Sequence, residues 1–188
     1  MKNADFRHEH KFFIESKHLL ILKKRLSCLL ETDAHSNEDG YTITSLYFDD
    51  YKQESLFTKL SGNSERFKWR IRRYSENSDA LVLELKEKNG ALVRKQRSSI
   101  TKESYYAALE DPAEYDCSDK DALQQLFFAN LRSRTLKPAV IVKYRRTAFI
   151  EKNTNTRITL DEQLSTGYAA FDLLNDNVHY LPVLPSGL

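Results

Sequence analysis

The chain of 188 residues is poor in the residues that usually interrupt or cross-link a fold, with five glycines, four prolines and two cysteines. The cysteines have neither C-x-x-C nor Cys/His spacing, so the sequence predicts no disulfide framework and no zinc site. No apolar run approaches about 18 residues and no signal-peptide pattern leads the chain, so we expect no membrane segment and a cytoplasmic setting. No motif repeats every ~20 to 50 residues, which excludes solenoids and propellers.

Neither sign of charge is in large excess either, because the chain has 29 Lys and Arg and 27 Asp and Glu, which gives a formal net charge of +2. A globally basic nucleic-acid binder and an acidic disordered tail are both excluded. The charge is nevertheless uneven along the chain. Residues 66–97 hold ten Lys or Arg against four acidic residues, and residues 134–157 hold seven against one. The near-neutral total therefore hides two basic regions.

The apolar patterning and turn residues predict about seven strands and three or four helices in one domain over residues 1–188. The expected strands are 5–14, 41–49, 66–74, 80–88, 92–100, 139–150 and 154–161, and the expected helices are 16–30, 51–60, 101–109 and 118–132. Ser16 and Ser118 are the expected helix caps, and Asn89-Gly90 is the expected hairpin turn. Residues 162–188 have no clear pattern. The mixed order predicts an α+β fold on an antiparallel sheet.

Long ionic side chains share one face of most of these strands, because alternate residues of a strand point to opposite faces. The set comprises Arg7, Glu9, Lys11, Lys68, Arg70, Arg72, Glu84, Lys86, Lys88, Lys95, Arg97, Arg146, Arg157 and Asp161, with the polar Tyr144 on the same side. The opposite face is apolar, with Leu81, Leu83, Leu85, Ile158 and Leu160. A charged ladder thus runs through the sheet.

For a single strand, a face in water explains such alternation well. It explains neighbouring strands poorly, since like charges opposite one another destabilise a sheet, by roughly 2 to 3 kcal/mol at ~6 Å and an effective dielectric near 20. A sheet closed on itself would turn the charges inward and cover its apolar face with helices. We therefore expect an antiparallel β-barrel or tunnel with a basic interior that holds a polyanion. Phosphate is the natural ligand, because Arg forks match its oxygens.

Other functional classes have weaker support in the residues. An aromatic set (Tyr41, Tyr47, Phe48, Trp69 and Tyr74) interleaves with basic residues as in single-strand nucleic-acid binders, but we expect most of these rings to pack under helices. His8 and His10 flank Glu9, yet alternation turns them away from it. The sequence has no nucleophile elbow and no Gly-rich phosphate loop, which disfavours serine hydrolases and P-loop enzymes.

Six segments, taken in order, resemble the VTC domain, the polyphosphate polymerase module of the triphosphate tunnel metalloenzyme (CYTH-like) superfamily. They are Arg7-His-Glu-His-Lys-Phe, Tyr41-Thr-Ile-Thr-Ser-Leu-Tyr-Phe-Asp, Lys68-Trp-Arg-Ile-Arg-Arg-Tyr, Leu83-Glu-Leu-Lys, Lys143-Tyr-Arg-Arg-Thr-Ala-Phe and Arg157-Ile-Thr-Leu-Asp. The resemblance covers about residues 5 to 161. It implies an eight-stranded tunnel that binds a nucleoside triphosphate and a divalent metal, manganese or magnesium, and transfers the γ-phosphate to a polyphosphate chain.

The resemblance also implies roles for individual residues. The phosphate-binding set is Lys11, Arg70, Arg72, Lys86, Lys95, Arg146 and Arg157, with Tyr144 adding a hydroxyl group. Of these, Arg70, Arg72, Lys86 and Arg146 are expected to be catalytic, by aligning the phosphates and stabilising charge on the transferring group. A metal that bridges phosphate oxygens needs carboxylates, and Glu9, Glu84 and Asp161 lie on the predicted inner side.

One departure from the family pattern concerns the final strand, which in the family carries a Glu-x-Lys pair whose Glu binds the metal. The present sequence ends at Pro185-Ser-Gly-Leu188, where this strand is expected. We therefore expect either a truncated domain or an eighth strand from another chain, with open edges prone to self-association. Two alternatives to the polymerase remain: a triphosphatase, in which water is the acceptor, and a non-catalytic binder of polyphosphate or oligophosphates.

Overall fold

The computed structural model describes residues 6–33, 40–75 and 78–183, which form nine strands and four helices. The strands are β1 (Arg7–His8), β2 (Glu31–Thr32), β3 (Tyr41–Asp49), β4 (Glu65–Tyr74), β5 (Leu81–Asn89), β6 (Leu92–Ile100), β7 (Lys137–Glu151), β8 (Thr156–Gly167) and β9 (Tyr180–Pro182). The helices are α1 (Ser16–Leu29), α2 (Glu54–Leu60), α3 (Lys102–Glu110) and α4 (Ala122–Ser133). None of these helices is long and apolar enough to cross a membrane.

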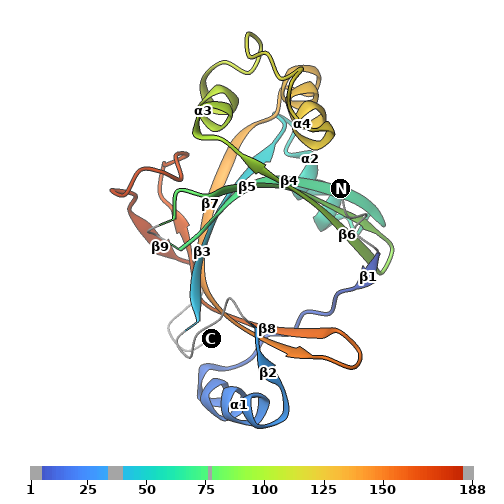
Figure 1. Cartoon of the computed structure of the whole chain (residues 1–188), viewed down its shortest axis with the longest axis vertical. Helices are drawn as coiled ribbons and strands as arrows, with labels where there is room; N and C mark the ends of the chain where they lie inside the picture. The colour runs from blue at the N-terminus through green and yellow to red at the C-terminus, as the bar shows by residue number, and fades with distance from the viewer. Residues whose placement is uncertain (1–5, 34–39, 76–77, 184–188) are drawn as a thin grey trace.

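All nine strands belong to one antiparallel sheet in the order β1-β6-β5-β4-β3-β7-β8-β9, with β2 paired to β7. The sheet curls into a ring with the helices outside it (Figure 1). Within the described residues no hydrogen-bonded pair joins β1 to β8 or β9, so the ring is open at this edge. The predicted α+β class and tunnel-like architecture are confirmed, while closure of the barrel is not complete.

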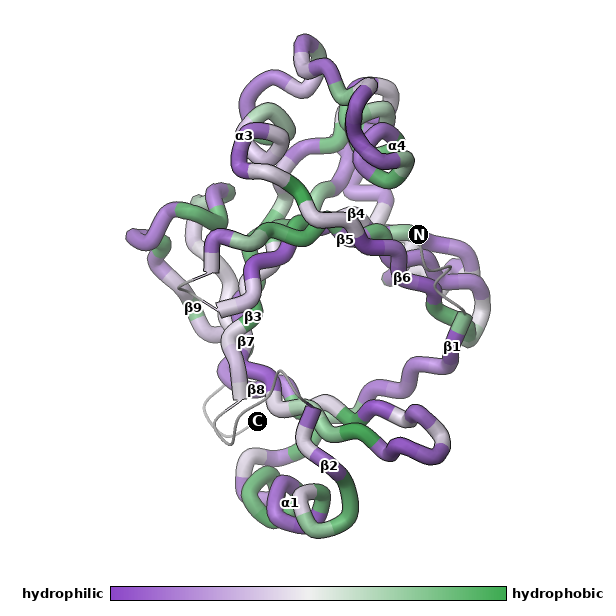
Figure 2. The backbone as a smooth tube through the Cα atoms, in the orientation of Figure 1, coloured by the Kyte–Doolittle hydropathy of each residue, from purple (hydrophilic) through white to green (hydrophobic). Residues whose placement is uncertain are grey.

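Helices α3 and α4 cover the outer face of the ring over β3, β4 and β5, as the apolar alternation predicts (Figure 1). The main core joins strand residues Leu46, Phe48, Trp69, Ile71, Leu81, Leu83 and Leu85 to Tyr105, Phe127 and Phe128 of α3 and α4. The Trp69 and Phe127 rings lie 5.1 Å apart between centroids. Hydrophobic and hydrophilic residues alternate along the strands beneath these helices (Figure 2). The burial of one face leaves the charged face to line the inside.

A smaller core lies under α1, on the opposite side of the ring. It consists of Leu26, Phe149 and Leu160, with partly buried residues around them. Leu160 is buried as predicted, but Ile158 is 37% exposed and α1 does not cover it. The helix therefore protects only part of the outer surface of β8.

Several strand boundaries differ from the sequence prediction. The expected strand 5–14 pairs only at β1, and residues 9–15 lie outside any strand because no neighbouring segment in the described chain offers them backbone partners. β2 and β9 were not expected. β8 continues to Gly167, past the predicted end at Asp161, and its pairing with β7 shifts register there, with Gln163 at a φ of 55°. This irregularity interrupts the two-residue alternation, which explains why the sequence pattern fails beyond Asp161.

The starts of two helices also differ from the expected caps. Ser16 is the first residue of α1, and the preceding Glu15 makes no side-chain capping hydrogen bond. Asp121, rather than Ser118, caps α4, since its Oδ1 accepts hydrogen bonds from two backbone N–H groups of the first turn at 2.9 and 3.1 Å. The predicted hairpin between β5 and β6 is confirmed, but its turn lies one residue later than expected. Asn89 pairs with Leu92, so the two turn residues are Gly90, at a φ of 58°, and Ala91.

Candidate functional site

Residues paired across neighbouring strands form rows on the inner face of the ring, opposite to α3 and α4. The arginine row consists of Tyr47, Arg70, Glu84 and Arg97, from β3, β4, β5 and β6 in turn. The lysine row consists of Lys68, Lys86 and Lys95, from β4, β5 and β6. The rows are adjacent, because each lysine lies two residues along its strand from a member of the arginine row, about 7 Å away. Neighbours within a row are about 4.5 to 5.5 Å apart.

The centre of the arginine row is Glu84, whose side chain is fully buried. Its Oε2 accepts hydrogen bonds from Nε and Nη2 of Arg70 at 2.7 and 2.5 Å. Its Oε1 lies 2.9 Å from Nε of Arg97 and 3.5 Å from Nη1 of Arg72. Burial acts to raise the pKa of Glu84, but the three guanidinium groups outweigh it and hold the pKa at about 2. Glu84 is therefore ionised and shared among three arginines.

Arg70 and Arg72 are buried, and besides contacting Glu84 their guanidinium groups donate hydrogen bonds to protein hydroxyl groups. The acceptors are the Tyr47 hydroxyl for Arg70, at 2.9 Å, and the hydroxyls of Ser45, Tyr74 and Tyr144 for Arg72, each at 3.2 Å. The position of both guanidiniums is thus determined by neighbours on three other strands. Both guanidiniums lie on the inner side of their strand, but because they are buried they contribute positive charge to the inner face without being exposed on it.

The lysine row places three like charges directly opposite one another. Burial is the largest cause that lowers the pKa of all three lysines. The pKa of Lys95 falls to about 7, because the charges of Arg70 and Lys86 add to its burial. Glu9, from the segment after β1, forms an ion pair with Lys86, and its own pKa falls to about 2 because Lys86, Lys95 and Lys11 outweigh its burial. Within the described residues, Glu9 forms its ion pair with Lys86 alone, and it acts on Lys95 only through its charge.

The other side of the inner face comes from β7 and β8. Arg146 makes a two-pronged ion pair with Asp161, with both nitrogen–oxygen distances at 2.6 Å. Arg157 approaches Asp33 at 2.8 Å and donates a hydrogen bond to the Tyr41 hydroxyl at 3.2 Å. The Arg146 guanidinium also stands over the ring of Tyr144, which connects this side to Arg72. Lys11, expected on a strand, lies exposed in the segment between β1 and α1.

The three expected metal ligands are not brought together. Glu9 pairs with Lys86, Glu84 with its three arginines, and Asp161 with Arg146. Across residues 6–33, 40–75 and 78–183, no group of three or more His, Cys, Asp or Glu side chains lies close enough to hold a metal ion. A hard divalent ion prefers several free oxygen ligands, and here each candidate carboxylate already has a cationic partner. The described residues therefore do not fit a metal held by protein carboxylates.

The sequence prediction missed several residues of the inner face. Lys68 and Arg97 lay on the correct side of their strands by alternation but were not assigned to the site. Most of the five aromatic rings were expected to pack under helices, but only Phe48 and Trp69 do so, while the hydroxyls of Tyr41, Tyr47 and Tyr74 contact arginines. Tyr47 shares strand parity with the site arginines once β3 is paired with β4, a register that the sequence did not reveal. His8 and His10 are exposed, with stacked rings 6.4 Å apart, outside the rows.

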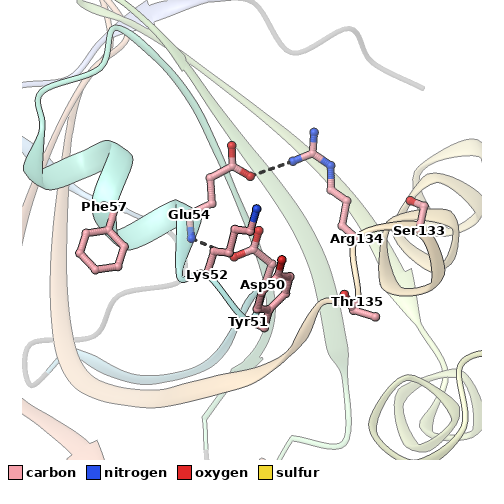
Figure 3. A pocket seen from close by; sticks show the side chains of 8 residues that line it. All are labelled: Asp50, Tyr51, Lys52, Glu54, Phe57, Ser133, Arg134 and Thr135. Carbon is pink, nitrogen blue, oxygen red and sulfur yellow. Dashed lines mark hydrogen bonds and ion pairs between the residues drawn. The ribbon is translucent and has the colours of Figure 1, made fainter.

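A separate pocket of about 490 Å³ lies outside the ring, between the start of α2 and the end of α4 (Figure 3). Its lining consists of Asp50, Tyr51, Lys52, Glu54, Phe57, Ser133, Arg134 and Thr135. The charges in it offset one another, and Arg134 lies 3.4 Å from Glu54. It contains no residue of either row, so the concentrated positive charge of the chain belongs to the inner face.

The fold and the inner face define an α+β protein whose antiparallel sheet forms an open, cation-lined ring. The chain belongs to the VTC domain family, because the model of that family matches residues 6–183. The comparison with curated proteins gave no match.

Solved structures that are similar to the chain include the following two. A putative adenylate cyclase from Bacillus halodurans has 17% identity and a TM-score of 0.49, over 88% of this chain and 72% of that one. A putative adenylyl cyclase from Hippeastrum, described as having a dominant triphosphatase activity, has 14% identity and a TM-score of 0.48, over 89% of this chain and 73% of that one.

Proposed function

We propose that the chain is a polyphosphate polymerase domain, which transfers the γ-phosphate of a nucleoside triphosphate to the end of a polyphosphate chain on the inner face of the ring. The observation that carries the proposal is the lysine row. Three lysines opposite one another destabilise the sheet by themselves, and Glu9 forms an ion pair with one of them, Lys86. A row of phosphates would neutralise them. Membership of the VTC domain family supports the same conclusion.

A linear polyphosphate suits this face better than a compact anion. The lysine row, Arg97, and the pairs around Arg146 and Arg157 belong to different strands, so cations follow one another around and along the inner face. Each phosphate of a chain carries at least one negative charge at neutral pH, and Arg and Lys side chains match phosphate oxygens. A single orthophosphate is too small to contact cations on several strands at once.

The proposed reaction needs positioning and charge stabilisation. A terminal oxygen of the polyphosphate acceptor attacks the γ-phosphorus, the bond from that phosphorus to the β,γ-bridging oxygen breaks, and nucleoside diphosphate leaves with the bridging oxygen. The cations would hold both phosphate chains in line and stabilise the charge on the transferring group. Lys86, Lys95 and Arg146 are the residues we expect to do this, with Arg70 and Arg72 adding charge from their buried positions.

The test is incubation of the chain with ATP and either Mn²⁺ or Mg²⁺, with the products separated on a gel. Long phosphate chains would support the polymerase. Orthophosphate as the sole phosphate product would contradict it in favour of the triphosphatase, in which water is the acceptor. The double substitution Lys86→Met and Lys95→Met should abolish most of the activity. Lys152→Met, in an exposed turn where Lys152 pairs with Glu31, is the control for lysine loss away from the ring.

A second candidate function is a non-catalytic binder of polyphosphate or other oligophosphates. The observation that favours it is the pairing of Glu9, Glu84 and Asp161 with cations, which leaves no free carboxylate among these three. For this function, tripolyphosphate should bind tightly in EDTA, and ATP should remain intact when Mn²⁺ is restored. Turnover of ATP by the unmodified chain would exclude it.

A further inference from the structure

We propose that Glu84 is a positioning residue that holds the Arg97 guanidinium toward the bound phosphate chain, and that Arg97 is a further phosphate-binding residue. This inference rests on the proposed function. It also disagrees with the role of metal ligand that the family resemblance suggests for Glu84. The argument depends on how the oxygens of Glu84 are used and on how Arg97 differs from the other two arginines.

The side chain of Glu84 is fully buried, and both of its carboxylate oxygens already have arginine partners. Oε2 accepts two hydrogen bonds from Arg70, and Oε1 lies between Arg97 and Arg72. A metal at Glu84 would have to displace guanidinium groups and leave them unpaired in a buried place, which is strongly unfavourable. The carboxylate is therefore suited to hold arginines, not a metal ion.

Arg97 differs from its two neighbours in exposure. The side chains of Arg70 and Arg72 are 9% and 3% exposed, whereas that of Arg97 is 48% exposed. Arg97 approaches Glu84 through Nε, which is the nitrogen nearest to the aliphatic stem. An arginine anchored through Nε keeps its terminal nitrogens for a second anion, and their fork matches phosphate oxygens. Of the three arginines around Glu84, Arg97 is thus the one placed to touch a ligand.

The position of Arg97 links the two rows. It follows Lys95 by two residues on the inner side of β6, about 7 Å along the strand. A phosphate chain on the lysine row would therefore reach Arg97 with its next phosphates. A long, half-exposed side chain loses freedom when it binds a ligand, so its anchoring by Glu84 before binding lowers that cost. Without Glu84, Arg97 would remain charged but would no longer be held in place.

The test is a double-mutant cycle on the affinity for tripolyphosphate, measured by calorimetry in EDTA. In the unmodified chain, Arg97→Ala should weaken binding about tenfold or more, the loss expected for charge-assisted hydrogen bonds. In the Glu84→Gln background, Arg97→Ala should change the affinity less than about twofold, because Arg97 is no longer anchored. Arg94→Ala is the matched control, since Arg94 pairs with Glu87 on the outer side of the same hairpin. It should leave the affinity unchanged.

Two results would overturn the inference. One is an equal effect of Arg97→Ala in both backgrounds, which would mean that Arg97 acts without Glu84. The other is a coupling that appears only when Mn²⁺ is present, which would make Glu84 a metal ligand. A purely structural Glu84 would lower the melting temperature of Glu84→Gln and leave Arg97→Ala as damaging as before, which is the first of these results.

A second variant covers the case in which Glu84→Gln does not fold. Arg97→Lys keeps the charge on a half-exposed side chain but has one ammonium nitrogen in place of the fork, so it has no separate nitrogens for Glu84 and for two oxygens of a phosphate. It should bind tripolyphosphate nearly as weakly as Arg97→Ala, and full affinity would contradict the inference. Failure of the unmodified chain to make polyphosphate from ATP, with tripolyphosphate binding intact, would overturn the polymerase proposal alone.

Discussion

Burial and the neighbouring positive charges lower the pKa of Lys95 to about 7. Near neutral pH it is therefore only partly protonated in the free chain. A bound phosphate chain favours the charged form and raises the pKa again. Binding should then take up a proton, and affinity for tripolyphosphate should fall as the pH rises above 7, by up to about tenfold per pH unit.

This prediction is measured by calorimetry between pH 6 and pH 9 in buffers of different ionisation enthalpy. Lys95→Arg is the control, since arginine stays charged over this range and reports the titration of the ligand itself. The difference between the two proteins isolates Lys95. Identical pH dependence in both would contradict the lowered pKa.

The same lysine gives a prediction for stability. Its pKa is lower in the folded chain than in the unfolded chain, where it lies near 10.4. The unfolded state therefore binds more protons between about pH 7 and pH 10.4, so this group makes the fold less stable below pH 7 and the penalty disappears as the pH rises through that window. Lys95→Met should raise the free energy of unfolding by about 1 to 3 kcal/mol at pH 6. Thermal melts at pH 6 and pH 10 measure it, and an equal gain at both would contradict it.

At the scale of elements, the contact of β3 with β7 depends on Gly40, just before β3. Gly40 has a φ of +75°, and an added Cβ would lie 2.5 Å from the carbonyl oxygen of Arg146. Gly40→Ala should therefore destabilise the chain by about 2 kcal/mol or more, through the left-handed backbone and the clash together. The melting temperature, measured by circular dichroism, should fall by about 4 °C or more.

Gly62 provides a matched control for Gly40. Its φ is +73°, but an added Cβ would have no atom within 4 Å. Gly62→Ala should cost only the backbone preference, about 1 kcal/mol. Equal destabilisation by the two substitutions would show that the clash of the added Cβ with β7 does not contribute to the loss of stability at Gly40.

The elements also show where sequence patterns were sufficient. The meander of β4, β5 and β6 was predicted from alternation and from the Asn89-Gly90 turn, because both signals are local. The end of β8 and the irregular segment 9–15 were not predicted. The first depends on a bulge against β7 and the second on the lack of a described partner strand, and neither is visible in a local pattern. Asp121 caps α4 in place of Ser118 for a related reason, because the turn before the helix decides which side chain reaches its free N–H groups.

At the scale of the whole molecule, the ring gathers cations from β4, β5, β6, β7 and β8, so its field acts on a ligand as a unit. Tripolyphosphate at 100 times its Kd should stabilise the fold by about 2.7 kcal/mol and raise the melting temperature by about 5 to 11 °C. Raising the salt concentration from 50 to 500 mM should reduce this shift through screening. Orthophosphate at the same concentration is the control and should give a smaller shift. Equal shifts for the two ligands would contradict recognition of a phosphate chain.

The open edge of the ring is also a property of the whole molecule. β1 and β9 end the sheet within the described residues, and an unpaired edge is a template for strand addition. Self-association through these edges therefore stays a prediction from the sequence. Sedimentation of the full chain over a range of concentrations measures it.

The sequence by itself determined which side chains share the inner face of each strand, because the pleat of a β-strand alternates its side chains whatever its partners are. Lys86 and Glu84 could be assigned to one side without knowing what lay beside them. Only the tertiary structure decided that Lys68, Lys86 and Lys95 stand in one row, that Glu84 lies among three arginines, and that Tyr47 turns toward Arg70. These contacts depend on register between strands, which turns, bulges and distant partners set together.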